Sequence, residues 1–159
     1  MAGKPNKNGD IFTLHPSYIS KNKENDMLIL TPGDKTSRTK IISDDVIRAF
    51  AELTGDTNPV HLDDAYAAGT RFGRRIAHGM IAAGLISAAL ANDLPGPGTV
   101  YLGQTLQFKA PVFPGDTVTA TVEVKSVRSD KPIAVLSTFC TNQDNVIVLE
   151  GEATVLYTP

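Results

Sequence analysis

The sequence predicts an α+β domain in which one antiparallel sheet curls around a single central helix. The run Met80–Ala91 carries no charged residue and is apolar on nearly every face of a helical wheel, so a helix here must be buried on all sides. From Val100 onward the hydrophobic period changes from roughly 3.6 residues to roughly 2, which is the period of a strand. The apolar run is shorter than the ~20 residues that span a bilayer. We therefore expect no membrane partner.

Length, charge and cysteine content narrow the class of protein. A chain of 159 residues with a 42% hydrophobic fraction is large enough for one domain with a core. There are 15 Lys and Arg residues against 17 Asp and Glu, with no long basic run, which argues against nucleic acid as a partner. The single cysteine, Cys140, excludes an internal disulfide and a cysteine-based metal cluster, and its apolar neighbours indicate an inert core thiol. With no signal-like segment at the start, this predicts a cytoplasmic protein.

The first part of the chain, residues 1–30, is a poorly specified extension. It mixes Lys, Asn, Gly and Ser around one apolar cluster, Ile11–Leu14, and shows no sustained period. After it, Pro32–Asp34 has the composition of a turn and Thr36–Ile42 that of a strand. We therefore place a single domain over residues 31–159.

A helix is predicted between Ser43 and Gly55. Ser43 offers a capping hydroxyl, two aspartates follow it where the positive helix end favours them, and Gly55 suits the left-handed residue that ends a helix. The apolar residues between these ends recur at helical spacing: Val46, Ile47, Phe50 and Leu53. Asp56 then begins a loop, because the residue before Pro59 is pushed toward extended geometry. A second short helix is expected over about 63–68.

Strands are predicted for the rest of the chain. Thr117–Val124 alternates apolar with polar residues, as a half-exposed antiparallel strand does; the apolar ones are Val118, Ala120, Val122 and Val124. Turn signals stand at 114–116, 129–132 and 142–145. Their spacing predicts four long strands that run as a meander.

Asp56 and His61 are the candidate catalytic residues. On a helix, residues five apart point about 140° away from each other, but a loop turned at Asn58-Pro59 lets both side chains converge on one small ligand. A carboxylate and an imidazole that hold one water form a general acid/base pair. Taken alone, the same residues also fit local capping by Asp56 and Asn58, with His61 bonded to a main-chain carbonyl.

A longer motif surrounds these two residues. It resembles, in every specified position, the hydratase-2 signature of the MaoC-like, (R)-specific enoyl-CoA hydratases: Phe50, Leu53-Thr54-Gly55-Asp56-Thr57-Asn58-Pro59-Val60-His61 and Ala67. The similarity continues through Ile76-Ala77-His78-Gly79-Met80, Ser87, 95–104 and 108–116, and it covers roughly Thr31 to Tyr157. In particular, the chain resembles the short, single-hot-dog hydratases that supply monomers for polyhydroxyalkanoate synthesis.

The resemblance implies a hot-dog fold, an antiparallel sheet wrapped around a central buried helix, and a homodimer. It implies that Asp56 and His61 are the catalytic pair, that Ser87 orients Asp56, and that the Gly79 backbone N–H faces the thioester oxygen. The implied reaction is reversible hydration of a trans-2-enoyl-CoA to the (R)-3-hydroxyacyl-CoA in fatty-acid metabolism. No cofactor is implied, because coenzyme A is part of the substrate.

Two alternatives use the same fold. One is a 3-hydroxyacyl-[acyl-carrier-protein] dehydratase, which predicts a basic patch beside the site for an acidic partner. The other is a non-catalytic module that binds acyl thioesters. The presence of Asp56, His61 and Gly79 argues against this second alternative.

The remaining polar residues are assigned outside the site. His78 fits a structural residue or pocket wall better than a catalytic group. The three histidines, His15, His61 and His78, have no ligand-like spacing, so no metal is expected. Four basic residues fit a solvated face better than a phosphate site: Arg71, Arg74, Arg75 and Lys109.

Overall fold

A turn and the first strand begin the part of the chain that the structure, a computed structural model, describes, which is residues 29–158. The predicted turn at Pro32–Asp34 is present, with Gly33 at a positive φ of 97°. It leads into β1 (Lys35–Ile41), close to the predicted strand. Gly33 N–H donates to the carbonyl of Val124 at 2.9 Å, so the turn also fastens this end of β1 to a later strand. The expected extension, residues 1–30, lies almost wholly outside the described residues.

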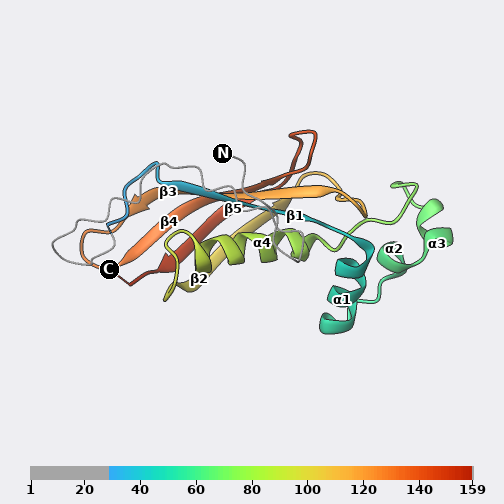
Figure 1. Cartoon of the computed structure of the whole chain (residues 1–159), viewed down its shortest axis with the longest axis horizontal. Coiled ribbons are helices and arrows are strands. Elements are labelled where there is room, and N and C mark those ends of the chain that lie inside the picture. Colours follow the sequence, from blue (N-terminus) through green and yellow to red (C-terminus); the bar gives the residue numbers. More distant parts are fainter. Residues whose placement is uncertain (1–28, 159) are drawn as a thin grey trace.

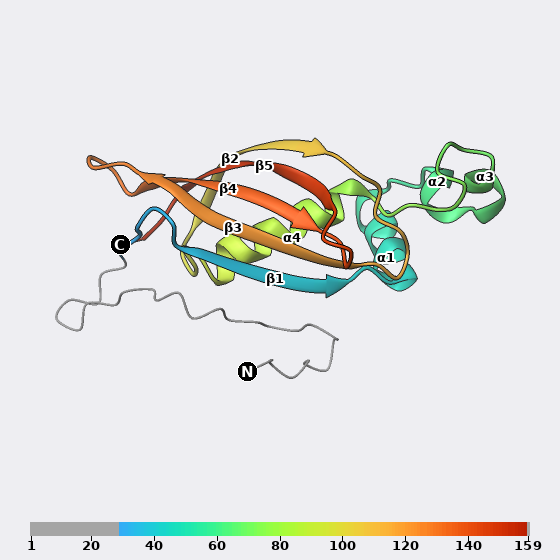
Figure 2. The same ribbon diagram turned by 90° about the horizontal axis from the view of Figure 1, so that it is seen from above.

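Five antiparallel strands form one sheet in the order β1-β3-β4-β5-β2 (Figure 2). The remaining strands are β2 (Val100–Phe108), β3 (Thr117–Val127), β4 (Ile133–Thr141) and β5 (Ile147–Leu156). The predicted meander is confirmed for β3, β4 and β5. It is wrong for β2, which pairs with β5 and not with β3.

The turn at Pro114–Asp116 explains this difference. Gly115 N–H donates to the carbonyl of Ile42, and Ile42 N–H donates to the carbonyl of Asp116, both at 2.8 Å. These bonds place the turn beside the end of β1. The segment 109–116 therefore crosses from one edge of the sheet toward the other, and its Pro-Gly turn ends a crossover instead of closing a hairpin.

One face of the sheet carries the core. The predicted alternation in β3 is confirmed, because Val118, Ala120, Val122 and Val124 are all buried. Cys140 on β4 is fully buried on the same core, and burial raises the pKa of its thiol to about 12, as an inert core cysteine requires.

The central helix α4 (Gly79–Asn92) lies along this face, as the apolar run predicts (Figure 1). Its sheet-facing residues are buried: Ile81, Ala82, Ile86, Ala89 and Leu90. In the single chain, however, the helix is not buried on all sides. Met80 is 52% exposed, and Gly84 and Ala91 are also exposed. The prediction of all-round burial is therefore wrong for one chain by itself, and one face of α4 stays uncovered beside β2.

Three short helices gather at the end of the molecule where α4 begins: α1 (Asp44–Thr54), α2 (Pro59–Leu62) and α3 (Asp64–Ala68) (Figure 1). The predicted caps of α1 are confirmed. Ser43 accepts a hydrogen bond from Val46 N–H at 3.3 Å, and Gly55 ends the helix at a φ of 76°. Among residues 29–158, none of the helices has the length and apolar character needed to cross a membrane.

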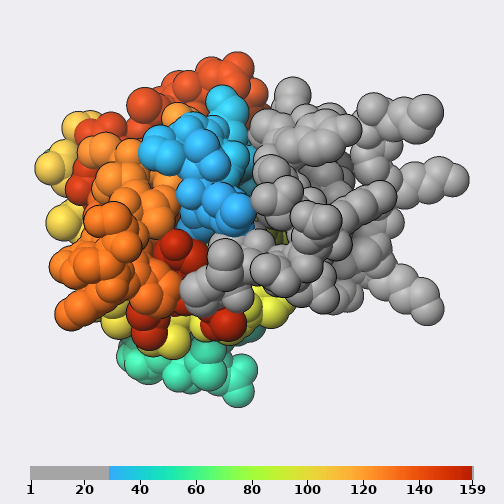
Figure 3. Space-filling view, turned by 90° about the vertical axis from the view of Figure 1, so that its left-hand side faces the viewer, coloured from blue at the N-terminus to red at the C-terminus, as the bar shows by residue number. Residues whose placement is uncertain are grey.

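The opposite end of the molecule is formed by the β3–β4 hairpin, the residues before β1 and the end of the described chain (Figure 3). The candidate catalytic residues lie at the other end, among the short helices. The sheet therefore acts as a rigid support for a site built largely from the segment between α1 and α4.

Candidate active site

Asp56 lies in the loop between α1 and α2, in a local turn. Its Oδ1 accepts a hydrogen bond from Asn58 N–H at 3.3 Å, and Asn58 Oδ1 accepts one from Val60 N–H at 3.2 Å. The local capping considered from the sequence is thus present. The carboxylate of Asp56 nevertheless remains exposed, so its second oxygen is free to meet a ligand.

His61 lies on the one-turn helix α2, where the sequence predicts a loop. The prediction fails because a proline at the first position of a helix loses no hydrogen bond, and Asn58 caps the turn. Asp56 precedes this helix, so the two side chains still converge. His61 is 9% exposed, and its Nδ1–H donates to the carbonyl of Ile76 at 2.8 Å. This bond leaves Nε2 as an acceptor.

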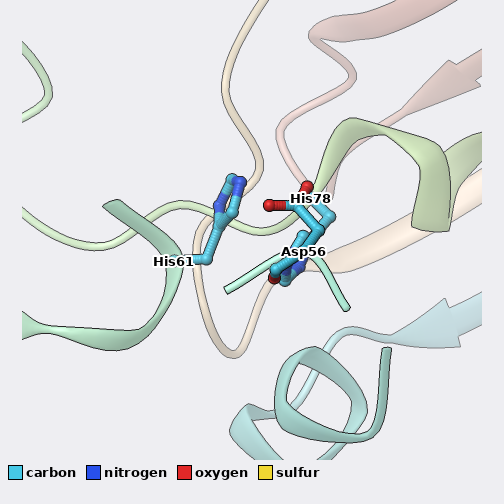
Figure 4. Close-up of side chains that lie close together, drawn as sticks. All are labelled: Asp56, His61 and His78. Atoms are coloured by element: carbon cyan, nitrogen blue, oxygen red, sulfur yellow. The ribbon is translucent and has the colours of Figure 1, made fainter. Parts of the chain in front are cut away.

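His78 completes the group. It is 3% exposed and is the residue before the first turn of α4. Its ring centroid lies 3.9 Å from that of His61, and the ligand atoms of Asp56, His61 and His78 all lie within 4.8 Å of one another (Figure 4). The structure therefore brings together Asp56 and His61, as predicted, and adds a histidine assigned outside the site.

An Asp-His-His group of this size matches the residue types of a metal site. Each imidazole donates one N–H to a main-chain carbonyl, that of Ile76 for His61 and that of Asp56 for His78, which leaves one acceptor nitrogen on each ring, as in a histidine that binds a metal. The two rings, however, overlap with an interplanar angle of 32°. A metal ion lies in the plane of each imidazole that binds it, which overlapping rings do not favour. The arrangement suits a shared water better.

A cavity of about 350 Å³ opens beside His61 and Gly79. Its walls are mostly apolar, with Phe108 and Val112 among them, and it is large enough for part of a small-molecule ligand. Gly79 is the first residue of α4, where N–H groups have no partner within the helix and the helix dipole favours negative charge. A Cβ at Gly79 would lie 2.5 Å from Cε1 of Phe108, so only glycine lets that ring pass so close.

Ser87 lines a second cavity, of about 460 Å³, between α4 and β2. Phe50, Tyr101 and Leu106 also line it. Within residues 29–158 no hydrogen bond joins Ser87 to Asp56, so the structure leaves the orienting role of this hydroxyl as a prediction.

The four basic residues outside the predicted site have different surroundings. Arg71 and Lys109 line the cavity beside His61, a position that the sequence did not reveal. Arg74 lies 3.7 Å over the ring of Phe113. Arg75 donates to Asp64 at 2.7 Å and to Asp44 at 2.5 Å, and these bonds raise its pKa. Arg75 is therefore structural, since it joins the short helices.

The Arg75 contacts also fix the position of His61. A third bond from the Arg75 guanidinium reaches the main-chain oxygen of His61 at 3.3 Å. The carboxylate of Asp44 also accepts a hydrogen bond from Arg48. The guanidinium groups of Arg48 and Arg75 together lower the pKa of the Asp44 carboxyl. This network holds α1, α2 and α3 together beside the start of α4.

A sheet packed on one long helix, with an acid and a histidine beside the helix N-terminus, defines the class of hot-dog hydratases and dehydratases. The chain belongs to the MaoC-like family, because the MaoC like domain matches residues 30–141. It is 50% identical to the (R)-specific enoyl-CoA hydratase of Aeromonas caviae over 79% of this chain and 94% of that protein. It is 52% identical to the 3-hydroxybutyryl-CoA dehydratase of Methylorubrum extorquens over 74% of each.

A solved structure supports the same assignment. The (R)-hydratase from A. caviae involved in PHA biosynthesis superposes with a TM-score of 0.79 at 49% identity, covering 80% of this chain and 97% of that one. The hot-dog fold predicted from the sequence is thereby confirmed.

Proposed function

We propose that this protein catalyses the reversible hydration of trans-2-enoyl-CoA thioesters to (R)-3-hydroxyacyl-CoA. The observation that carries the proposal is the convergence of Asp56 and His61 at the start of α4, beside an apolar cavity that Gly79 also lines. Close similarity to relatives that carry this activity supports it. Hydration adds water across a double bond without a change of oxidation state, so the reaction needs no redox cofactor.

Gly79 polarises the thioester in this mechanism. Addition of water to the β carbon places negative charge on the thioester oxygen as an enolate forms. The N–H of Gly79 and the positive end of the α4 dipole stabilise that charge, and in a partly dry cavity such stabilisation is worth more than in water. The β carbon becomes electrophilic as a result.

Asp56 and His61 hold and activate the water. The bond from His61 Nδ1–H to Ile76 fixes the tautomer, so Nε2 faces the site as an acceptor. Asp56 takes a proton from the water as the oxygen attacks the β carbon, and the protonated Asp56 then gives this proton to the α carbon from the same face. A free aspartate has a pKa of about 3.9, far below that of water, so proton transfer accompanies attack and does not precede it.

The direct test follows loss of the enoyl-thioester absorbance of crotonyl-CoA on addition of the protein, with chiral analysis of the product. Fast loss that gives the (R)-alcohol is the expected result. An (S)-product, or no loss with crotonyl-CoA, longer enoyl-CoA thioesters and carrier-protein thioesters, would contradict the proposal and favour a binding module.

The basic side chains at the cavity keep one alternative open, a dehydratase of carrier-protein thioesters. Arg71 could meet either coenzyme A phosphates or an acidic carrier protein, whereas Lys109 Nζ already lies 2.9 Å from Glu150 Oε1. The ratio of kcat/KM for crotonyl-CoA and crotonyl-carrier protein separates the two. We favour CoA thioesters because two relatives at 50% and 52% identity are named as a hydratase and a dehydratase of CoA thioesters.

Replacing Arg71 with alanine is expected to raise KM for crotonyl-CoA about tenfold and to leave kcat within twofold. The guanidinium is a binding group for phosphate, remote from the reacting carbons, and loss of one charge-assisted contact costs about 1.5 kcal/mol. Crotonyl-pantetheine, which lacks the phosphates, should show no such change. Arg74→Ala is the matched control, because Arg74 packs on Phe113. Equal KM effects with both thioesters would remove Arg71 from the phosphate site.

We further propose a homodimer formed through the uncovered face of α4 and the neighbouring edge strand β2. This face exposes large apolar side chains together with an unpaired strand edge: Met80, Val100, Tyr101, Leu102 and Phe108. Sedimentation analysis should give twice the chain mass of 16.9 kDa. A mass of one chain at micromolar concentration would contradict the dimer.

The cytoplasm, where Cys140 stays a thiol, is the proposed location.

In this dimer Ser87 is proposed to orient Asp56. Ser87 lies on the same helix as Gly79 and faces the cavity between α4 and β2, which a second subunit would cover.

A further inference from the structure

We propose that His78 is a positioning residue that holds both catalytic groups, Asp56 through its main chain and His61 through its ring. The inference rests on the proposed function and goes beyond it, because His78 takes no part in the proton transfers described above. It contacts Asp56 at the main-chain oxygen and His61 at the ring.

The first contact fixes the loop that carries Asp56. Nε2–H of His78 donates to the main-chain oxygen of Asp56 at 2.9 Å. The other bonds of Asp56 are local and long, both at 3.3 Å, to Thr54 Oγ1 and from Asn58 N–H. Within residues 29–158, the His78 bond is therefore the one that ties Asp56 to a distant part of the chain. That part is the start of α4, directly beside Gly79.

The second contact fixes the ring of His61. The centroids of the His61 and His78 rings lie 3.9 Å apart, and Phe50 packs on His78 with a centroid separation of 4.9 Å (Figure 4 shows the two histidines with Asp56). The His61 ring is thus held at Nδ1 by Ile76 and across its face by His78. A small tilt of this ring would move Nε2 away from the water that it holds.

The other nitrogen of His78 shows that its role is not mainly to stabilise the fold. Nδ1 is buried and has no hydrogen-bond partner among the described residues. An unpaired buried polar atom destabilises the folded state. The adjoining cavity has about 10 Å³ and apolar walls that include Ile42 and Ile81. A phenylalanine would keep the ring contacts and remove this cost, which offsets the loss of the bond to Asp56, so stability by itself does not favour histidine.

These contacts suggest two variants with opposite losses. His78→Phe keeps an aromatic ring against His61 and Phe50 but removes the donor to Asp56. His78→Gln removes the ring but can place an amide N–H near the position of Nε2. Positioning through the hydrogen bond predicts that kcat for crotonyl-CoA falls about 30-fold in His78→Phe, with KM within threefold. It also predicts that His78→Gln recovers at least part of the lost kcat.

Two further readouts separate positioning from a purely structural role. The midpoint of thermal unfolding of His78→Phe should stay close to that of the wild type, because removal of the unpaired nitrogen offsets loss of the bond to Asp56. In the background of Asp56→Asn, where there is no carboxylate to position, His78→Phe should lower kcat by no more than about twofold. A structural role would instead lower the unfolding midpoint together with activity and would give additive losses.

Three results would overturn the proposal: wild-type kcat in His78→Phe, additive losses in the double variant, or an activity loss that follows a lower unfolding midpoint. If the wild type does not hydrate enoyl thioesters, it is the proposed function that fails. Amide hydrogen exchange of residues 55–61 then decides whether His78 positions this segment. Faster exchange in His78→Phe at an unchanged unfolding midpoint upholds the proposal, and unchanged exchange rejects it.

Discussion

Replacing Asp56 with asparagine is expected to lower kcat for crotonyl-CoA hydration by a factor of hundreds or more. The amide has the shape of the carboxylate, and its oxygen can still accept the bond from Asn58 N–H. It cannot take a proton from water, however, and a positioned general base typically contributes about 10²–10⁴ in rate. Because the lost interaction belongs to the transition state, KM should change little. Steady-state kinetics at saturating crotonyl-CoA measure the effect.

Asp63→Asn is the matched control for this variant. Asp63 is also an exposed aspartate in a capping position, and its Oδ1 accepts the bond from Tyr66 N–H at 2.9 Å. The Asp63→Asn variant makes the same change of charge a short distance along the chain, so the kcat of this variant should stay within about twofold of the wild type. If Asp56→Asn retained a fifth of wild-type kcat, Asp56 would not be the base.

The variant Gly151→Ala is expected to lower the free energy of unfolding by about 3 kcal/mol or more. Gly151 lies on β5, opposite Leu106 on β2. A Cβ there would lie 1.8 Å from the main-chain oxygen of Thr105 and 2.7 Å from its carbonyl carbon. Backbone atoms of a paired strand cannot turn aside as a side chain can. The pairing of β2 with β5 must therefore open, and Phe108 would lose its place against Gly79.

Gly103→Ala provides the comparison on the same pair of strands. A Cβ at Gly103 meets nothing within 4 Å, and its φ is not positive. Its unfolding free energy should therefore stay within about 1 kcal/mol of the wild type. Urea unfolding followed by circular dichroism gives both values. Equal stability of the two variants would show that β2 adjusts freely around Gly151.

The parts of the fold that the sequence predicts are those with local causes. Ser43 and Gly55 bound α1 because capping depends on neighbouring residues, and the uncharged run Met80–Ala91 marks α4 because burial shows in composition. The partner of β2 has no such local cause. A Pro-Gly-Asp turn has the same sequence whether it closes a hairpin or ends a crossover, so the pairing of β2 with β5 was not predictable.

The candidate site also contains features with local causes, which the sequence predicts, and features without them. Asp56 and His61 are close along the chain, so their convergence was predictable, although the helical turn at Pro59 was not. The contribution of His78 depends on how α4 meets the loop before α2, which no spacing reveals. Arg71 reaches the cavity for a similar reason: the fold, and not the sequence pattern, decides which basic residues face it.

The strand order also determines when the site can form during synthesis of the chain. A nascent chain that has emerged as far as Phe113 already contains Asp56, His61 and Gly79. It also contains Val112, whose carbonyl accepts a bond from Ala77 N–H. Yet among the described strands β1 pairs only with β3, and β3 supplies the largest part of the surface on which α4 packs. The segment that carries Asp56 and His61 is therefore expected to gain its full support only after β3 has been synthesised.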